Sequence, residues 1–167
     1  MKRIYAILSL LLLLSVGATA QVRIGYFSYS DAMQSMPEYR MAQEEVSRIR
    51  AQYESEVKRS EEEFSAKYED FLDNLTSYAA SIRRKRQVEL QQLMESNLKF
   101  REEAQRLIKQ AEDEAMEPVK ARLSEVLAQT ARQHGYVVVL NTDADTCPYI
   151  DPTMGEDITP LLKQALQ

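Results

Sequence analysis

Glycine, cysteine, histidine and tryptophan are rare or absent in this sequence. Its 167 residues include four Gly, five Pro, one Cys, one His and no Trp. No Gly lies between Gly25 and Gly135, and the only prolines in that stretch are Pro37 and Pro118. Because turns depend on Gly and Pro, this composition excludes an all-β or doubly wound fold for the middle of the chain, and it excludes glycine-rich phosphate loops. A single Cys and a single His exclude most zinc sites and most catalytic triads.

The first 20 residues have the pattern of a secretory signal peptide. Lys2 and Arg3 precede an apolar run from Ile4 to Val16, and Ala18–Ala20 is typical of a cleavage site. The run is shorter than the roughly 20 residues of a membrane span. We therefore expect cleavage after Ala20 and export of a soluble chain of 147 residues. This mature chain would carry 19 basic and 26 acidic residues, a net charge of −7, which disfavours nucleic acid as a partner.

Short strand-like segments occur at both ends of the mature chain. Val22, Ile24 and Tyr26 alternate with other residues, which predicts a strand with these three side chains on one face. A short helix is expected over residues 30–36. Near the other end, Tyr136–Leu140 is apolar on both faces, as a buried strand would be.

The C-terminal segment carries further signals for secondary structure. His134 and Gly135 are typical of the end of a helix, because His favours the C-terminal dipole and Gly the position that follows. Cys147–Ile150 suggests a brief edge strand. Thr159 as an N-cap, with Pro160 at the first helical position, predicts a terminal helix.

Residues 38–133 are charged and favour helix, with apolar residues spaced at about 3.6 positions. The seam comprises Tyr39, Ala42, Val46, Ile49, Tyr53, Val57, Ser60, Phe64, Tyr68, Phe71 and Leu75 in the first half, and Ile82, Arg86, Leu90, Leu93, Asn97, Phe100, Ala104, Leu107, Ala111, Ala115, Val119, Leu123 and Val126 in the second. Capping and turn residues predict a reversal near 74–77, so we expect an antiparallel helical hairpin. Pro118 should kink or interrupt the returning helix.

A single uninterrupted helix is the competing interpretation of the middle segment. It would place the two strand segments roughly 150 Å apart, where neither could form a domain. A hairpin instead joins 21–37 and 134–167 into one β-containing body, in which 22–28 can pair with 136–141. The expected fold class is therefore α+β. Because two helices bury a narrow seam and the body is small, we also expect an oligomer.

One dense basic run follows the expected reversal and consists of Arg83, Arg84, Lys85 and Arg86. It either contacts an anionic surface, such as lipid head groups or acidic loops of a partner, or forms a solvated helical face near Asp70 and Asp73. The acidic runs Glu61–Glu63 and Glu112–Glu114 either hold neighbouring arms apart by repulsion or form ordinary solvated faces.

No pattern in the sequence indicates catalysis or metal binding. His134 has no partners that would complete a triad, and the paired carboxylates lie on exposed helices. Residues 141–145 faintly resemble a calcium loop, but Thr146 stands where Gly is required and Pro152 where Glu closes the loop. We therefore expect no metal, no cofactor and no enzymatic activity. Cys147 is either an inert thiol or an intermolecular bridge.

Five apolar residues of the middle segment lie off the seam: Met41, Leu72, Met94, Leu98 and Ile108. They either flank the contact between the two helices or leave the arms mildly apolar. Flexible Met and Leu side chains beside charges suit the reversible capture of many partners.

Both ends of the chain resemble the Skp/OmpH family. Arg23–Phe27 followed by Ser30–Met33 is similar to the opening strand and short helix of that family, and Leu75–Ser77 before the basic run is similar to the start of its returning arm. The closing pattern of the family is matched by Gly135–Leu140, Tyr149–Ile150, Asp157–Thr159 and Leu162. The resemblance covers essentially the whole mature chain.

The resemblance implies a trimeric periplasmic chaperone that holds unfolded outer-membrane proteins without ATP. Three subunits would join their strands into a central β-barrel, and three hairpins would enclose a cavity for the client. By this analogy the trimer is built by Val22, Ile24, Tyr26, Val137 and Val139. The basic run and Leu72, Met94, Leu98 and Ile108 would contact clients, and the basic run could also touch an anionic membrane surface. Well-studied members of the family are basic, whereas this mature chain has a net charge of −7. We therefore expect apolar contacts to contribute more to client binding than electrostatic ones.

An alternative of another class is a structural or adaptor protein of the cell envelope, whose hairpin docks to one folded partner. Such a docking site should show a compact aromatic or Arg cluster. The thin spread of apolar residues favours the chaperone.

Overall fold

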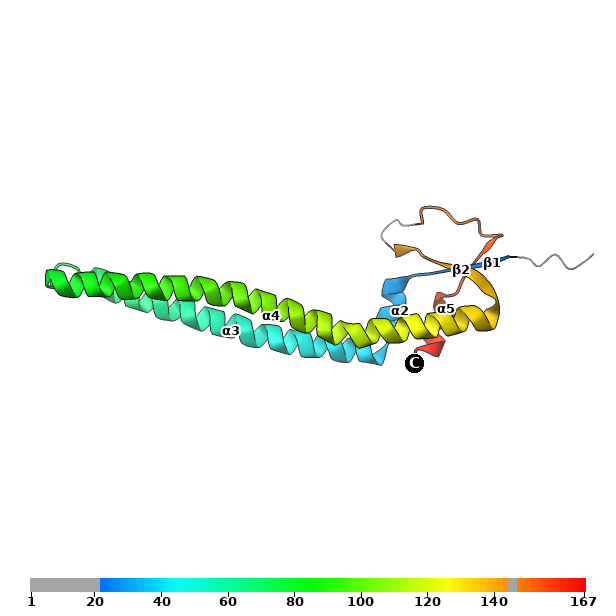
Figure 1. The fold of residues 1–167 in the computed structure, drawn as a ribbon, viewed down its shortest axis with the longest axis horizontal. Helices are drawn as coiled ribbons and strands as arrows, with labels where there is room; N and C mark the ends of the chain where they lie inside the picture. The colour runs from blue at the N-terminus through cyan, green and yellow to red at the C-terminus, as the bar shows by residue number, and fades with distance from the viewer. Residues whose placement is uncertain (1–21, 144–146) are drawn as a thin grey trace, which may run out of the picture. The chain divides into compact units, whose positions relative to one another are not determined.

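The computed structural model of the protein describes residues 22–143 and 147–167. The expected signal peptide, residues 1–20, lies outside these residues. The described chain is mostly helical, with long helices and a small sheet, as expected for an α+β fold (Figure 1). Its elements are β1 (Arg23–Phe27), α2 (Tyr29–Ser35), α3 (Pro37–Asp73), α4 (Ala80–His134), β2 (Tyr136–Asn141), β3 (Gly155–Asp157) and α5 (Thr159–Ala165). None of the described helices has the length and apolar character needed to cross a membrane.

The chain divides into two compact units. The sheet unit contains the described residues up to Ala32 together with Val126–Ala165. The hairpin unit contains Met33–Glu125 and Leu166–Gln167. The long helix α4 contributes residues to both units.

The sheet unit is built on β1, which is the middle strand of three. Strands β2 and β3 both run parallel to it, in the order β2-β1-β3. Ile24 lies opposite Val138 and Tyr26 opposite Leu140, with an irregularity between Arg23 and Ile24. The predicted pairing of the first strand with residues 136–141 is therefore confirmed.

The edge strand lies at Gly155–Asp157, so the prediction of a strand at Cys147–Ile150 is wrong. Ile150 packs against the strand instead of extending the sheet. A Cβ atom placed on Gly155 would clash with Cγ2 of Ile150. Pro148 also lacks the N–H group that a strand needs for pairing.

The terminal helix α5 begins as expected, but Thr159 is its first residue and not its N-cap. The Asp157 carboxylate accepts a hydrogen bond from the Thr159 N–H at 2.9 Å, and the Thr159 hydroxyl accepts one from the Ser28 N–H at 3.1 Å. The hydroxyl thus satisfies a donor at the end of β1. Ile158 and Leu162, 1% and 0% exposed, form the centre of this small core.

The hairpin unit consists of α3, the connection 74–79 and most of α4. Contacts between the two helices pair Glu38 with Arg122, the Ser60 carbonyl with Asn97, and Glu61 with Arg101. Residue numbers rise along one helix as they fall along the other, so the helices are antiparallel. The interpretation as one uninterrupted helix is wrong. The expected reversal at 74–77 falls within the connection.

Helix α4 continues through Pro118, so the expected interruption does not occur. Val119 and Leu123, which follow the proline in α4, are buried at 3% and 1% exposed. The helix ends at His134 as predicted, and Gly135 follows with a φ of 71°. This left-handed conformation is the one that favours Gly after a helix.

Candidate functional site

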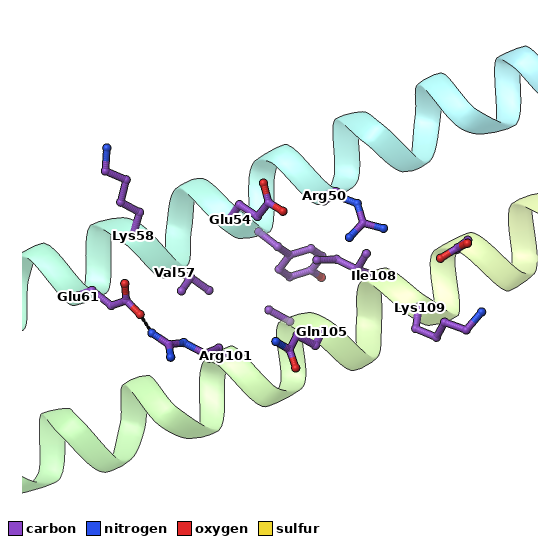
Figure 2. Close-up of a pocket in the computed structure, with 12 residues that line it drawn as sticks. Arg50, Glu54, Val57, Lys58, Glu61, Arg101, Gln105, Ile108 and Lys109 are labelled. Atoms are coloured by element: carbon purple, nitrogen blue, oxygen red, sulfur yellow. Dashed lines mark ion pairs between the residues drawn. The ribbon is translucent and has the colours of Figure 1, made fainter.

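One face of the hairpin unit is hollowed between α3 and α4. A cavity of about 460 Å³ lies there, and Tyr53 and Val57 from α3 line it together with Ala104 and Ile108 from α4. Figure 2 shows charged side chains around its rim, including Arg50 and Lys109. Val57 and Ala104 contribute small side chains to this lining.

A second hollow of about 280 Å³ continues along the same face. Its lining includes Phe64, Met94 and Leu98. Both hollows share Glu61 and Arg101, whose ion pair crosses from one helix to the other (Figure 2). We call the two hollows together, with the ion pair between them, the groove.

The apolar residues predicted to contact partners are placed differently by the structure. Ile108 is 7% exposed and lines the floor of the groove, which fits the interpretation that it flanks the contact between the helices. Its contact with clients stays a prediction. Leu72, Met94 and Leu98 are 47%, 54% and 57% exposed. Met41 is also exposed. The groove therefore has a buried floor and exposed apolar residues beside it.

The basic run lies in the first turns of α4 and is exposed. Lys85 and Arg86 pair with Glu89 of the same helix, at 3.6 Å and 2.9 Å. Arg83 donates a hydrogen bond to the Tyr78 carbonyl at 3.4 Å. For Arg84 the described chain shows no ion pair.

The reversal is held by contacts to Asp70. Its carbonyl accepts a hydrogen bond from the Asn74 side chain at 2.9 Å, and its carboxylate accepts one from the Tyr78 hydroxyl at 3.3 Å. Phe71 is buried and stacks on the Tyr78 ring. Desolvation of the Tyr78 hydroxyl raises its pKa, and the nearby Asp70 charge raises it further by a smaller amount.

The acidic runs have cationic partners within the hairpin unit. Glu62 pairs with Lys58, and Glu63 pairs with Lys67 and accepts a hydrogen bond that lowers the pKa of Glu63. In the second run Asp113 pairs with Lys109 at 2.7 Å. These contacts favour ordinary solvated faces over repulsion between arms.

The strand residues predicted to form an oligomer interface remain accessible in the single chain. Val22 and Val137 are 55% and 70% exposed. Ile24, Tyr26 and Val139 are half-buried. The sheet unit therefore presents apolar strands that its own core does not cover.

Sequence reasoning missed a charged cluster around Arg23. The guanidinium donates to the His134 carbonyl at 2.6 Å and to Glu156 at 2.7 Å, and it lies 4.6 Å from the centre of the Tyr136 ring. Hydrogen bonds lower the pKa of Glu156, with the larger effect from Tyr136 and the smaller from Arg23. No local pattern could have found this cluster, because its members are more than 110 residues apart from Arg23.

Residues 141 and 143, in the segment that faintly resembled a calcium loop, bind the start of α2. The Asn141 side chain accepts a hydrogen bond from the Tyr29 N–H at 3.4 Å, and Asp143 accepts one from the Ser30 N–H at 2.6 Å. The Ser30 hydrogen bond lowers the pKa of Asp143. Residues 144 and 145 of that loop lie outside the described residues. Over 22–143 and 147–167, no group of three His, Cys, Asp or Glu residues is arranged to hold a metal ion.

Two comparisons with known proteins bear on these features. A search of curated proteins gives no match. The family model described as outer membrane protein (OmpH-like) matches residues 23–166, from the first residue of β1 to the residue after α5. OmpH-like proteins are a family of periplasmic chaperones, and not of enzymes, that bind outer-membrane proteins in general. The protein therefore belongs to the OmpH-like family, the family that its two ends resemble in sequence.

Proposed function

We propose that this protein is an ATP-independent periplasmic holdase that captures unfolded outer-membrane proteins and prevents their aggregation. The observation that carries the proposal is the hairpin surface, on which apolar residues such as Leu72, Met94 and Leu98 are exposed among charged residues. Each contact with a client would be weak, and flexible Met and Leu side chains adapt to many sequences. Many weak contacts allow release without an energy source.

Capture would protect clients against the pairing of exposed strand edges, which is a common route to aggregation. We further propose that three chains assemble through their sheet units into a central β-barrel, with three hairpins around a client cavity. The exposed strand residues Val22 and Val137 support this assembly, because apolar strands at this exposure need a partner surface.

The function is tested with an unfolded outer-membrane β-barrel protein diluted from denaturant. Light scattering should fall to a small fraction of the control value when one trimer is present for each client, with no nucleotide added. Unchanged scattering at this ratio would overturn the holdase proposal. The adaptor alternative predicts instead one folded partner in stoichiometric amount after affinity capture from envelope extracts.

The assembly is tested by measuring the solution mass of the mature chain. We expect three times the chain mass for the native protein, and a lower mass for Val137→Asp, which places a charge in the expected interface. Val88→Asp is the matched control, since Val88 is 48% exposed on α4 and outside the sheet unit. A native mass of one or two chains would contradict the trimer.

A further inference from the structure

We propose that the groove on the hairpin unit is the surface on which an extended segment of an unfolded client lies. The segment would turn apolar side chains toward the two hollows and present backbone groups to the Glu61–Arg101 ion pair. This inference rests on the proposed holdase function and assigns the contact surface.

The groove is continuous along both helices. On α3 the lining includes residues at steps of three and four: Arg50, Tyr53, Val57, Glu61 and Phe64. The lining on α4 includes Met94, Leu98, Arg101, Gln105, Ile108 and Glu112, which have the same spacing. Steps of three and four keep residues on one face of a helix. The two hollows are therefore parts of one strip and not separate pockets.

The length of the groove fits an extended chain segment. From Arg50 to Ser65 the axis of α3 advances about 22 Å, at about 1.5 Å per residue. An extended chain covers this distance with about seven residues, at about 3.3 Å each. This is shorter than one transmembrane β-strand of about 9–11 residues. One strand of a client could thus fill the groove while the rest of the client stays outside it.

The chemistry of the groove suits one face of such a strand. Strands of outer-membrane barrels carry apolar and polar side chains in alternation, so their apolar side chains all point to one face. This apolar face can turn toward the two hollows while the polar side chains point to solvent. The Glu61 and Arg101 side chains are 44% and 53% exposed, so both can still form hydrogen bonds with the client backbone between the hollows.

The opposite face of the hairpin is less suited to capture. It also has a hollow, of about 600 Å³, lined by Ile49, Phe100 and Leu107. These three residues are half-buried. By contrast, Met94 and Leu98 line the groove and are each more than half exposed. The groove lining therefore includes two strongly exposed apolar side chains that a client could cover, whereas Ile49, Phe100 and Leu107 of the opposite hollow are less exposed.

The first test compares three substitutions on α4. Met94→Glu and Leu98→Glu place a charge in the groove, and each should weaken client binding roughly tenfold, because each removes one buried apolar contact. Val88→Glu is the matched control: Val88 has similar exposure, 48%, lies on the same helix and does not line the groove. It should leave affinity within about twofold. Equal losses in all three variants, or no loss in any, would overturn the assignment.

The second test uses a photoreactive label on introduced cysteines in a Cys147→Ser background. Gln105 lines the groove and Gln110 lines the opposite hollow, and both are exposed on α4. Labelled Gln105→Cys should cross-link an unfolded outer-membrane protein, and labelled Gln110→Cys should do so several-fold less. Equal cross-linking would place the client on both faces and overturn the assignment.

The proposed function and this inference fail in different ways. If the unmodified protein does not suppress client aggregation, the holdase proposal fails. If it suppresses aggregation and the groove variants do so equally well, capture occurs and the groove is not its surface.

Discussion

The sheet unit and the hairpin unit are held together by different kinds of contact. In the sheet unit, hydrogen bonds join residues far apart in sequence, such as Ser28 with Thr159, around the fully buried Leu162. In the hairpin unit most ion pairs join residues one turn apart, and α3 has only Val46 and Phe71 buried over 37 residues. In the sheet unit, buried apolar residues such as Ile158 and Leu162 thus hold together segments that are far apart in sequence. The hairpin unit buries apolar residues of α4 mainly between Ala104 and Leu123, and it leaves apolar side chains such as Leu72, Met94 and Leu98 exposed along its helices.

The largest effect should come from removing a core side chain of the sheet unit. Leu162→Ala should lower the free energy of unfolding by about 3 kcal/mol, because Leu162 is 0% exposed and a cavity would remain. Leu93→Ala, on the half-buried seam of α4, should cost about 1 kcal/mol. Urea unfolding followed by circular dichroism measures both. Equal losses would remove the contrast between the units.

Replacing Pro118 should stabilise the hairpin unit. Pro118→Ala restores the missing backbone N–H within α4 and should raise the free energy of unfolding by about 2 kcal/mol. Glu117→Ala, at the adjacent exposed position, is the control and should change it by less than about 0.5 kcal/mol. A loss of stability in Pro118→Ala would show that the proline serves the local packing.

A smaller effect is expected at the end of α4 in the sheet unit. Gly135 has a φ of 71°, and no atom lies within 4 Å of the place where a Cβ would stand. Gly135→Ala should therefore cost about 1 kcal/mol through backbone strain alone. Gly135→Asn should cost less, since Asn tolerates this conformation. Thermal unfolding of the two variants tests this difference. Equal melting temperatures for Gly135→Ala and Gly135→Asn would contradict the explanation by backbone strain.

The smallest effect concerns the pH dependence of the sheet unit. Hydrogen bonds from Tyr136 and Arg23 lower the pKa of Glu156 in the folded protein. The carboxylate therefore contributes stability above its unfolded pKa of about 4.3, and this contribution is lost as the pH falls through the folded value. Glu156→Gln should reduce stability at pH 7 and narrow the difference in melting temperature between pH 7 and pH 3. Glu69→Gln, an exposed position on α3, is the control and should leave that difference unchanged.

Periodic and local features could be predicted from the sequence. The 3.6 spacing indicated both long helices, the scarcity of Gly and Pro left one place for a reversal, and Gly135 marked the end of α4. Strand pairing followed because the hairpin brings the two ends of the middle segment together. These predictions depend on neighbours along the chain, which a sequence displays directly.

The remaining features depend on contacts that a sequence does not display. The edge strand was misplaced because Cys147–Ile150 has strand-like composition, whereas Gly155 is required by the close approach of Ile150. The sequence left two interpretations open for Ile108, because only the packing of the two helices shows that this position lies at the groove floor. The groove could not be foreseen either, since its lining residues come from two helices whose alignment a sequence does not display.

The central position of β1 in the sheet has a consequence for the order of folding. Its two neighbours, β2 and β3, begin at residues 136 and 155, more than 100 residues later in the chain. The sheet has a high contact order, and closing so long a loop would be slow for an unstructured chain. The hairpin contains mostly local contacts and places residue 38 beside residue 122, so its prior formation would shorten the effective loop. Refolding kinetics should therefore show helical structure forming before the sheet. During synthesis, all three strands can pair only after the chain has been made as far as Asp157, the last residue of β3.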